Sequence, residues 1–198
     1  MYSDVHTPEK YGIYQSVGDT TGPGGIVRAM RTIPMYEYFA KKIEECCPNA
    51  WVINYTNPMT LCVKTLYRVF PKIKAFGCCH EVFGTQKVLS FALDKVLGIK
   101  DIPREEIRVN PIAVNHFTWI TKAKYRNIDL FPVYEKFVEM YADNGYDEHV
   151  DQNWMNRGFH SKERIKMDLF RRYGYIAAAG DRHLAEFCPG KWYLENPQ

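Results

Sequence analysis

The chain lacks the long apolar runs and the clustered charges that mark several classes of protein. No stretch approaches the roughly 18 apolar residues that a membrane-spanning helix needs. The 26 lysines and arginines nearly balance the 23 aspartates and glutamates, and no basic run or aromatic–basic alternation occurs. Because phosphate binding needs clustered cations, we expect neither nucleic-acid nor membrane partners. The first residues lack the pattern of a secretory signal, so we expect a cytoplasmic protein.

The six cysteines do not form the spaced framework of a secreted, disulfide-rich domain. They stand at positions 46, 47, 62, 78, 79 and 188, so two of the possible pairs are sequence neighbours. In a reducing compartment most cysteines are buried apolar side chains, with an occasional metal ligand or nucleophile. Each thiol therefore needs further context before a function is assigned to it.

The sequence before residue 100 alternates strands and helices. We expect a long helix from Ile26 to about Cys47, interrupted at Pro34. Short apolar strands are expected over residues 51–56 and 73–78, followed by helices over 59–70 and 81–97. Asn57 and Pro58 have the chemistry of an N-cap and a first helical residue. This order predicts a βαβ unit and an α/β fold.

The pattern changes after Gly98. Strands are expected over 107–113 and 117–125, meeting near Asn115 and His116, and helices over 133–142, 161–173 and from Arg182 onward. We therefore predict two parts, residues 1–100 and residues 101–198, the second being part of a mixed α/β (α+β) domain. No internal repeat or low-complexity stretch is present.

Polar residues follow both strands of the expected βαβ unit. Ligands of open α/β sheets bind outside the carboxyl ends of the strands, which selects Asn57 after the first strand and Cys79 with His80 after the second. A thiolate and an imidazole suit a divalent cation. Residue type alone favours plainer interpretations, namely a buried thiol for Cys79, a helix-start residue for His80 and a hydrogen-bonded core residue for His116.

Four glycines lie within the eight residues Gly18–Gly25. Glycine permits tight turns and close backbone approach, so the simplest interpretation is a turn. The segment matches neither the Gly-x-Gly-x-x-Gly nor the Walker pattern, which leaves it a weak indicator of phosphate binding.

Five motifs in order resemble glycoside hydrolase family 4. They are VGDTTGPGGI at 17–26, INYTNPM at 53–59, GCCHEVFGT at 77–85, VNHFTW at 114–119 and GDRHLAEF at 180–187. The block at 77–85 is most similar to the α-galacturonidase branch. The resemblance implies a partial Rossmann-like parallel sheet, related to lactate and malate dehydrogenases, followed by part of a catalytic domain. It also implies NAD, a divalent metal that is usually manganese, and a homo-oligomer for the complete protein.

Position by position, the resemblance implies roles for nine residues. Cys79 and His116 match the metal ligands, and Asn57 matches a substrate-binding asparagine. Asp19 matches an acidic residue that raises the basicity of the catalytic base, and His80 stands where some members have an aspartate that protonates the leaving group. The base is usually a tyrosine, but residues 180–187 contain none, and Asp181 and His183 are the candidates there. The cofactor contacts fall on Asn54 and Gly24.

The family mechanism is a redox–elimination–addition sequence, which the resemblance implies for α-galacturonides. Hydride leaves C3 of the sugar, the C2 proton is removed, the aglycone is eliminated, water adds and the hydride returns. Such a mechanism needs no carboxylate pair, and we find no compelling pair. Arg28, Arg31 and Arg182 are candidates for binding a galacturonide carboxylate, although helix-surface positions are the simpler interpretation.

Nothing before Gly18 supplies the first strand and glycine-rich turn of a dinucleotide-binding domain, and family members are longer. We therefore expect a fragment that binds NAD poorly when alone. Other activities stay open: an α-galactosidase or α-glucosidase of the same family, a hydroxy-acid dehydrogenase, or an inactive fragment that acts only in association.

Overall fold

The computed structural model describes residues 2–146 and 161–194. Their contacts divide the chain into two units, Met1–Cys79 with Ala185–Gln198, and His80–Leu184. The helix α4 (Glu81–Leu97) belongs to the second unit because it packs against β3 (Ile107–Val114) and α5 (Phe131–Tyr141). The domain boundary expected near residue 100 remains a prediction about the whole protein.

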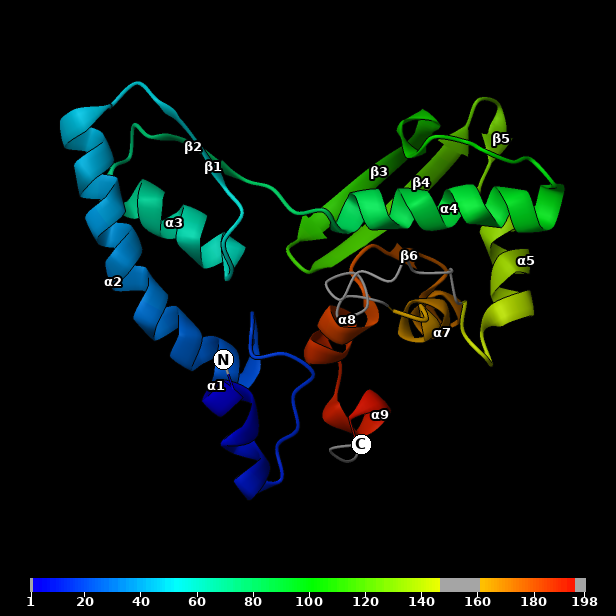
Figure 1. The fold of residues 1–198 in the computed structure, drawn as a ribbon, viewed down its shortest axis with the longest axis horizontal. Helices are drawn as coiled ribbons and strands as arrows, with labels where there is room; N and C mark the ends of the chain where they lie inside the picture. Colours follow the sequence, from blue (N-terminus) through cyan, green and yellow to red (C-terminus); the bar gives the residue numbers. More distant parts are fainter. Residues whose placement is uncertain (1, 147–160, 195–198) are drawn as a thin grey trace. The chain divides into compact units, whose positions relative to one another are not determined.

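The first unit contains the expected βαβ unit (Figure 1). Strands β1 (Trp51–Asn54) and β2 (Lys74–Gly77) are parallel, in a register that runs from Trp51 opposite Lys74 to Asn54 opposite Gly77. Helix α3 (Met59–Val69) connects them. The predicted βαβ unit is confirmed; its two strands pair directly, and their carboxyl ends share one edge of the sheet.

The long helix differs from its prediction at both its start and its middle. Helix α2 spans Gly22–Cys46 and passes through Pro34 without ending, so the predicted interruption is wrong. Pro34 lacks the N–H of an ordinary helical residue. Packing outweighs this loss, because α2 lies along α3 and buries Ala40 in a core with Leu66, Phe70 and Ile73. Two short elements precede α2, namely α1 (Tyr2–His6) and the 3-10 turn η1 (Pro8–Tyr11).

The start of α3 also differs from the expectation. The N-cap position belongs to Pro58 and the first helical residue is Met59, so the assignment of Asn57 as the N-cap is wrong. The Asn57 side chain is instead bonded to a residue far away in the sequence, as described below. A tertiary contact thus replaces the local cap.

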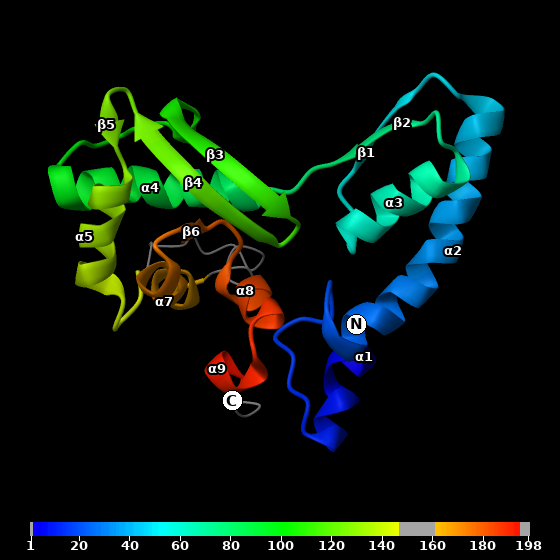
Figure 2. The ribbon, with the colours of Figure 1, turned by 180° about the vertical axis from the view of Figure 1, so that it is seen from behind.

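The second unit is an antiparallel sheet covered by helices (Figure 2). Strand β3 pairs with β4 (Phe117–Tyr125), which also pairs with β5 (Ile128–Asp129) and β6 (Ile176–Ala177). Helices α4, α5 and α7 (Arg164–Tyr173) contribute Leu89, Phe137 and Met167 to the core, where Ile120 of β4 is fully buried. The register shifts between Asn110 and Pro111, where proline interrupts the ladder.

The helix expected from Arg182 onward is two helices. Helix α8 spans Asp181–Phe187 and α9 spans Gly190–Tyr193, with Pro189 at the N-cap of the second. A short 3-10 turn, η2 (Arg104–Glu106), precedes β3. Among the described residues, no helix has the length and apolar character that crossing a bilayer requires.

Candidate functional site

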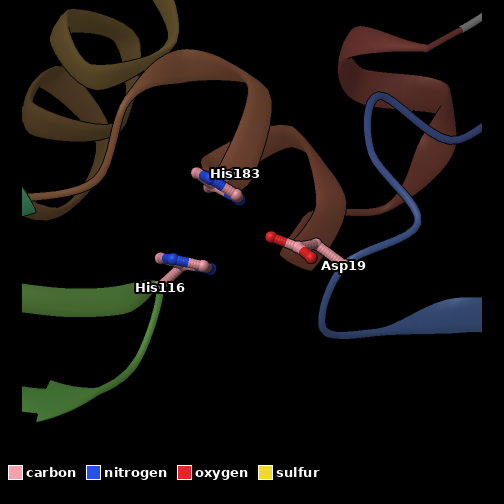
Figure 3. Close-up of side chains that lie close together, drawn as sticks. All are labelled: Asp19, His116 and His183. Carbon is pink, nitrogen blue, oxygen red and sulfur yellow. The ribbon is translucent and has the colours of Figure 1, made fainter. Parts of the chain in front are cut away.

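Asp19 is the centre of a buried polar network in the first unit. Its side chain is 9% exposed and lies on the loop before α2 (Figure 3). The guanidinium of Arg28 donates from Nη1 to Oδ1, and the amide of Asn57 donates from Nδ2 to Oδ2 over 2.8 Å. Both carboxylate oxygens therefore have donors, one from α2 and one from the turn after β1. The structure thus brings two predicted site residues, Asp19 and Asn57, into direct contact.

Glycines let the Asp19 loop lie against the first turn of α2. A Cβ on Gly25 would come within 2.6 Å of the Thr20 backbone, and one on Gly24 within 2.8 Å of the Asp4 carbonyl oxygen. The Gly24 N–H donates to Oε1 of Gln15 over 3.0 Å. The glycines of this segment therefore allow the close approach of backbones that glycine permits. Contact between Gly24 and the cofactor remains a prediction.

Asn54, the other predicted cofactor contact, is buried and bonded within the first unit. Its Oδ1 accepts from the Tyr36 hydroxyl over 2.5 Å and from the Thr56 N–H over 3.2 Å, and its Nδ2 donates to the Thr56 carbonyl oxygen over 2.9 Å. These bonds close the turn after β1. Burial raises the pKa of the Tyr36 hydroxyl. Asn54 thus shapes the loop that carries Asn57.

Two predicted site histidines of the second unit are in contact. His116 lies in the turn between β3 and β4 and is 3% exposed, and His183 lies on α8. Their rings stack with centroids 3.7 Å apart and planes 19° apart, as Figure 3 shows. His80, by contrast, is exposed at the N-cap of α4. Cys79 is half-buried, and it is the last residue of the first unit before the second unit begins at His80.

Asp181 is engaged in holding two helices of the second unit. It begins α8, and its Oδ1 accepts from the backbone N–H of Lys166 in the first turn of α7 over 3.2 Å. Lys166 is itself 2% exposed, with its Nζ 2.5 Å from Oε2 of Glu163 and 3.1 Å from Oγ1 of Thr85. Buried charges are retained when they are paired in this way. This network joins α7 to α4 and to the start of α8.

Glu81 and Glu186 lie inside two of the five motifs, at 77–85 and 180–187, and neither is among the predicted site residues. Oε1 of Glu81 accepts from the Thr118 hydroxyl over 2.5 Å. Burial raises the pKa of this carboxyl above its usual value, although the bond from Thr118 acts in the opposite direction. Glu186 binds the loop that carries Asp19. The sequence feature that could have identified both glutamates is a carboxylate within a short motif that already contains predicted site residues.

The predicted ligand types fit a divalent transition metal. The two predicted ligands are the imidazole of His116 and the thiol of Cys79, and both are donor types that bind divalent transition metals. Cys79 belongs to the first unit and His116 to the second, and their joint ligation of a metal remains a prediction. Among the candidate cations for a substrate carboxylate, Arg28 binds Asp19 and Arg31 binds Asp4 through both carboxylate oxygens.

Two family models match the chain. The model described as family 4 glycosyl hydrolase matches residues 1–95, and that of the family 4 glycosyl hydrolase C-terminal domain matches residues 113–197. The α-galacturonidase of Thermoanaerobacterium saccharolyticum is 67% identical over the whole chain, and that of Bacillus subtilis is 56% identical. The chain spans 43% and 44% of the lengths of these two relatives.

Solved structures agree in fold. The crystal structure of lplD from Bacillus subtilis matches 96% of this chain and 43% of its own, with a TM-score of 0.89 at 56% identity. A 6-phospho-α-glucosidase from gut microorganisms, solved with NAD and Mn²⁺, matches 92% of this chain and 39% of its own, with a TM-score of 0.66 at 19% identity. The α/β fold with a Rossmann-like part agrees with the prediction, and the chain belongs to family 4 of the glycosyl hydrolases.

Proposed function

We propose that this chain carries part of the active site of an α-galacturonidase that uses NAD and a divalent metal, manganese. The supporting observation is the gap in identity between relatives. Four α-galacturonidases are 56–67% identical over the whole chain. An α-galactosidase of Bacillus subtilis is 32% identical over 94% of the chain, and an α-glucosidase of Erwinia rhapontici is 31% identical over 63% of it. Because function depends on the residues of the site, a different substrate for this chain would require substitutions at the site relative to these α-galacturonidases.

The cofactor proposal rests on family relatives and on residue chemistry. Family structures have been solved with NAD and Mn²⁺, and the parallel strands of the first unit end at one sheet edge, where such folds bind dinucleotides. Cys79 and His116 would hold the metal. When bound, NAD supplies hydride transfer and the metal supplies polarisation of a sugar carbonyl.

The residues of the first unit orient the sugar in this proposal. The Asn57 amide is fixed by its bond to Asp19, and its Oδ1 is an acceptor that can bind a sugar hydroxyl. Asp19 is in turn held by Arg28, which neutralises the buried carboxylate. A fixed amide loses little freedom on binding, which favours orientation of the substrate.

In this proposal two histidines of the second unit, His183 and His80, move protons. We assign removal of the C2 proton to His183, because Asp181 is occupied by the first turn of α7. The ring of His183 is held by its stack on His116. His80 is exposed at the start of α4 and donates a proton to the leaving oxygen.

The test is a chimera in which these 198 residues replace the matching segment of the Bacillus subtilis α-galacturonidase, which is 56% identical. With NAD, manganese and a thiol reductant, nitrophenyl α-galacturonide should be cleaved faster than the α-galactoside or the α-glucoside, without net NADH. Faster cleavage of a neutral glycoside would assign a different specificity. Stoichiometric NADH would indicate a hydroxy-acid dehydrogenase, and no cleavage of any glycoside would contradict the proposal.

A further inference from the structure

Glu186 makes an unusual set of bonds within the first unit. Its Oε1 accepts three hydrogen bonds from successive backbone N–H groups, those of Asp19 over 3.0 Å, Thr20 over 2.7 Å and Thr21 over 3.0 Å. The Thr21 hydroxyl also donates to the Glu186 backbone carbonyl oxygen over 2.8 Å. One residue near the end of α8 thus engages three consecutive residues that are 165 to 167 positions away in the sequence.

The three N–H groups precede α2, whose first residue is Gly22. Successive amides that converge on one point form an anion-binding concavity, and the start of a long helix adds a partial positive charge. A carboxylate matches both features, and charge-assisted hydrogen bonds are stronger than those between neutral groups. In this chain the concavity is filled by the protein's own glutamate.

We infer that Glu186 is a positioning residue for Asp19. A side chain on a loop takes its orientation from the backbone, and the Asp19 N–H is one of the three anchored groups. With this backbone fixed, Oδ1 and Oδ2 of Asp19 face Arg28 and Asn57. The inference deepens the proposed function, on which it rests, because Asp19 fixes there the Asn57 amide that binds the substrate.

Removal of the carboxylate frees three donors at once. The amide hydrogens of residues 19–21 then exchange faster with water. The bond from Asn57 to Asp19 weakens, although neither residue is changed, because the Asp19 backbone is no longer anchored. Glutamine keeps an acceptor oxygen of the same reach without the charge. Thr21→Val removes only the hydroxyl bond to the Glu186 backbone. Glu186→Ala, Glu186→Gln and Thr21→Val therefore test separately the carboxylate, its charge and the bond to the Glu186 backbone.

The test compares Glu186→Ala, Glu186→Gln and Thr21→Val in the 198-residue chain, with the exposed Glu44→Ala of α2 as the control. Amide hydrogen exchange is followed at residues 19–21, and the side-chain amide signal of Asn57 is followed by nuclear magnetic resonance. Glu186→Ala should raise exchange at residues 19–21 at least about tenfold and shift the Asn57 signal, with substantial recovery in Glu186→Gln and small changes in the other two.

Unchanged loop exchange or an unmoved Asn57 signal in Glu186→Ala would overturn the inference. A uniform rise of exchange across the first unit would do the same, because it would indicate a general loss of structure. The glycoside assay of the chimera decides the proposed function separately, since the loop measurements need neither substrate nor cofactor.

Discussion

The ring of His183 lies on the ring of His116 with 3.7 Å between their centroids, although 67 positions separate the two residues in the sequence. One histidine comes from the turn after β3 and the other from α8. Stacked aromatic rings restrict each other's rotation, so each imidazole is held in a defined orientation. A fixed ring is what both metal ligation and proton transfer require.

Replacement of His183 by phenylalanine should separate its chemistry from its packing. Phenylalanine keeps a flat ring for the stack but has no nitrogen, so we expect stability within about 1 kcal/mol of the original and turnover lower by about 10²–10⁴-fold. Galacturonide turnover of the chimera and urea unfolding of the chain measure the two effects. Alanine at this position should lower both. Near-original turnover of the phenylalanine variant would remove His183 from proton transfer.

Cys79 and Cys78 form a matched pair for testing the metal site, because both are half-buried and adjacent. Loss of a thiolate ligand should lower manganese affinity at least about tenfold in Cys79→Ala, whereas Cys78→Ala should leave it near its original value. Titration calorimetry with manganese under reducing conditions gives both affinities. Equal affinities for the two variants would contradict ligation by Cys79.

The hydroxyl of Tyr134 is fully buried and has no hydrogen-bond partner among the described residues. Burial raises the pKa of this phenol well above its usual value. Since an unsatisfied buried hydroxyl is costly, Tyr134→Phe should leave stability unchanged or raise it by about 1 kcal/mol. The neighbouring Phe137→Ala should instead cost about 3–5 kcal/mol through cavity formation. Thermal and urea unfolding measure both, and a large loss in Tyr134→Phe would reveal a partner for the hydroxyl.

The ion pair of Asp4 and Arg31 should make stability depend on pH in the acid range. The hydrogen bonds from Arg31 hold the pKa of the Asp4 carboxyl below its usual value. A lowered folded-state pKa means that the stabilisation is present above the unfolded-state pKa of about 4 and is lost as pH falls through the lower folded-state value.

Urea unfolding of the original chain and of Asp4→Asn at several pH values tests this dependence. Their difference in stability should be full near neutral pH and should shrink below about pH 4. The exposed Asp143→Asn serves as the control, because its carboxylate is 91% exposed and lies 3.8 Å from Arg171. A constant difference across the pH range would contradict the assignment.

Local patterns predicted most of the elements well. Strands β1, β2 and β4 and helix α4 lie close to their expected ranges, because alternating apolar residues and glycine or proline boundaries act within a few positions. The errors fell where packing outweighed a local rule. Pro34 stays inside α2, and Asn57 binds Asp19 instead of capping α3.

The sequence by itself determined the βαβ unit, the location of Asn57 and Cys79 after its two strands, and the family, through five ordered motifs. Only the tertiary structure decided the partners of the site residues. Arg28 and Asn57 share Asp19, Glu186 binds the loop around it, His183 stacks on His116, and Lys166 donates its backbone N–H to Asp181. The reason is distance along the chain: strand and helix patterns depend on neighbours a few residues apart, whereas contacts such as that of Glu186 with Thr20 join residues 166 positions apart.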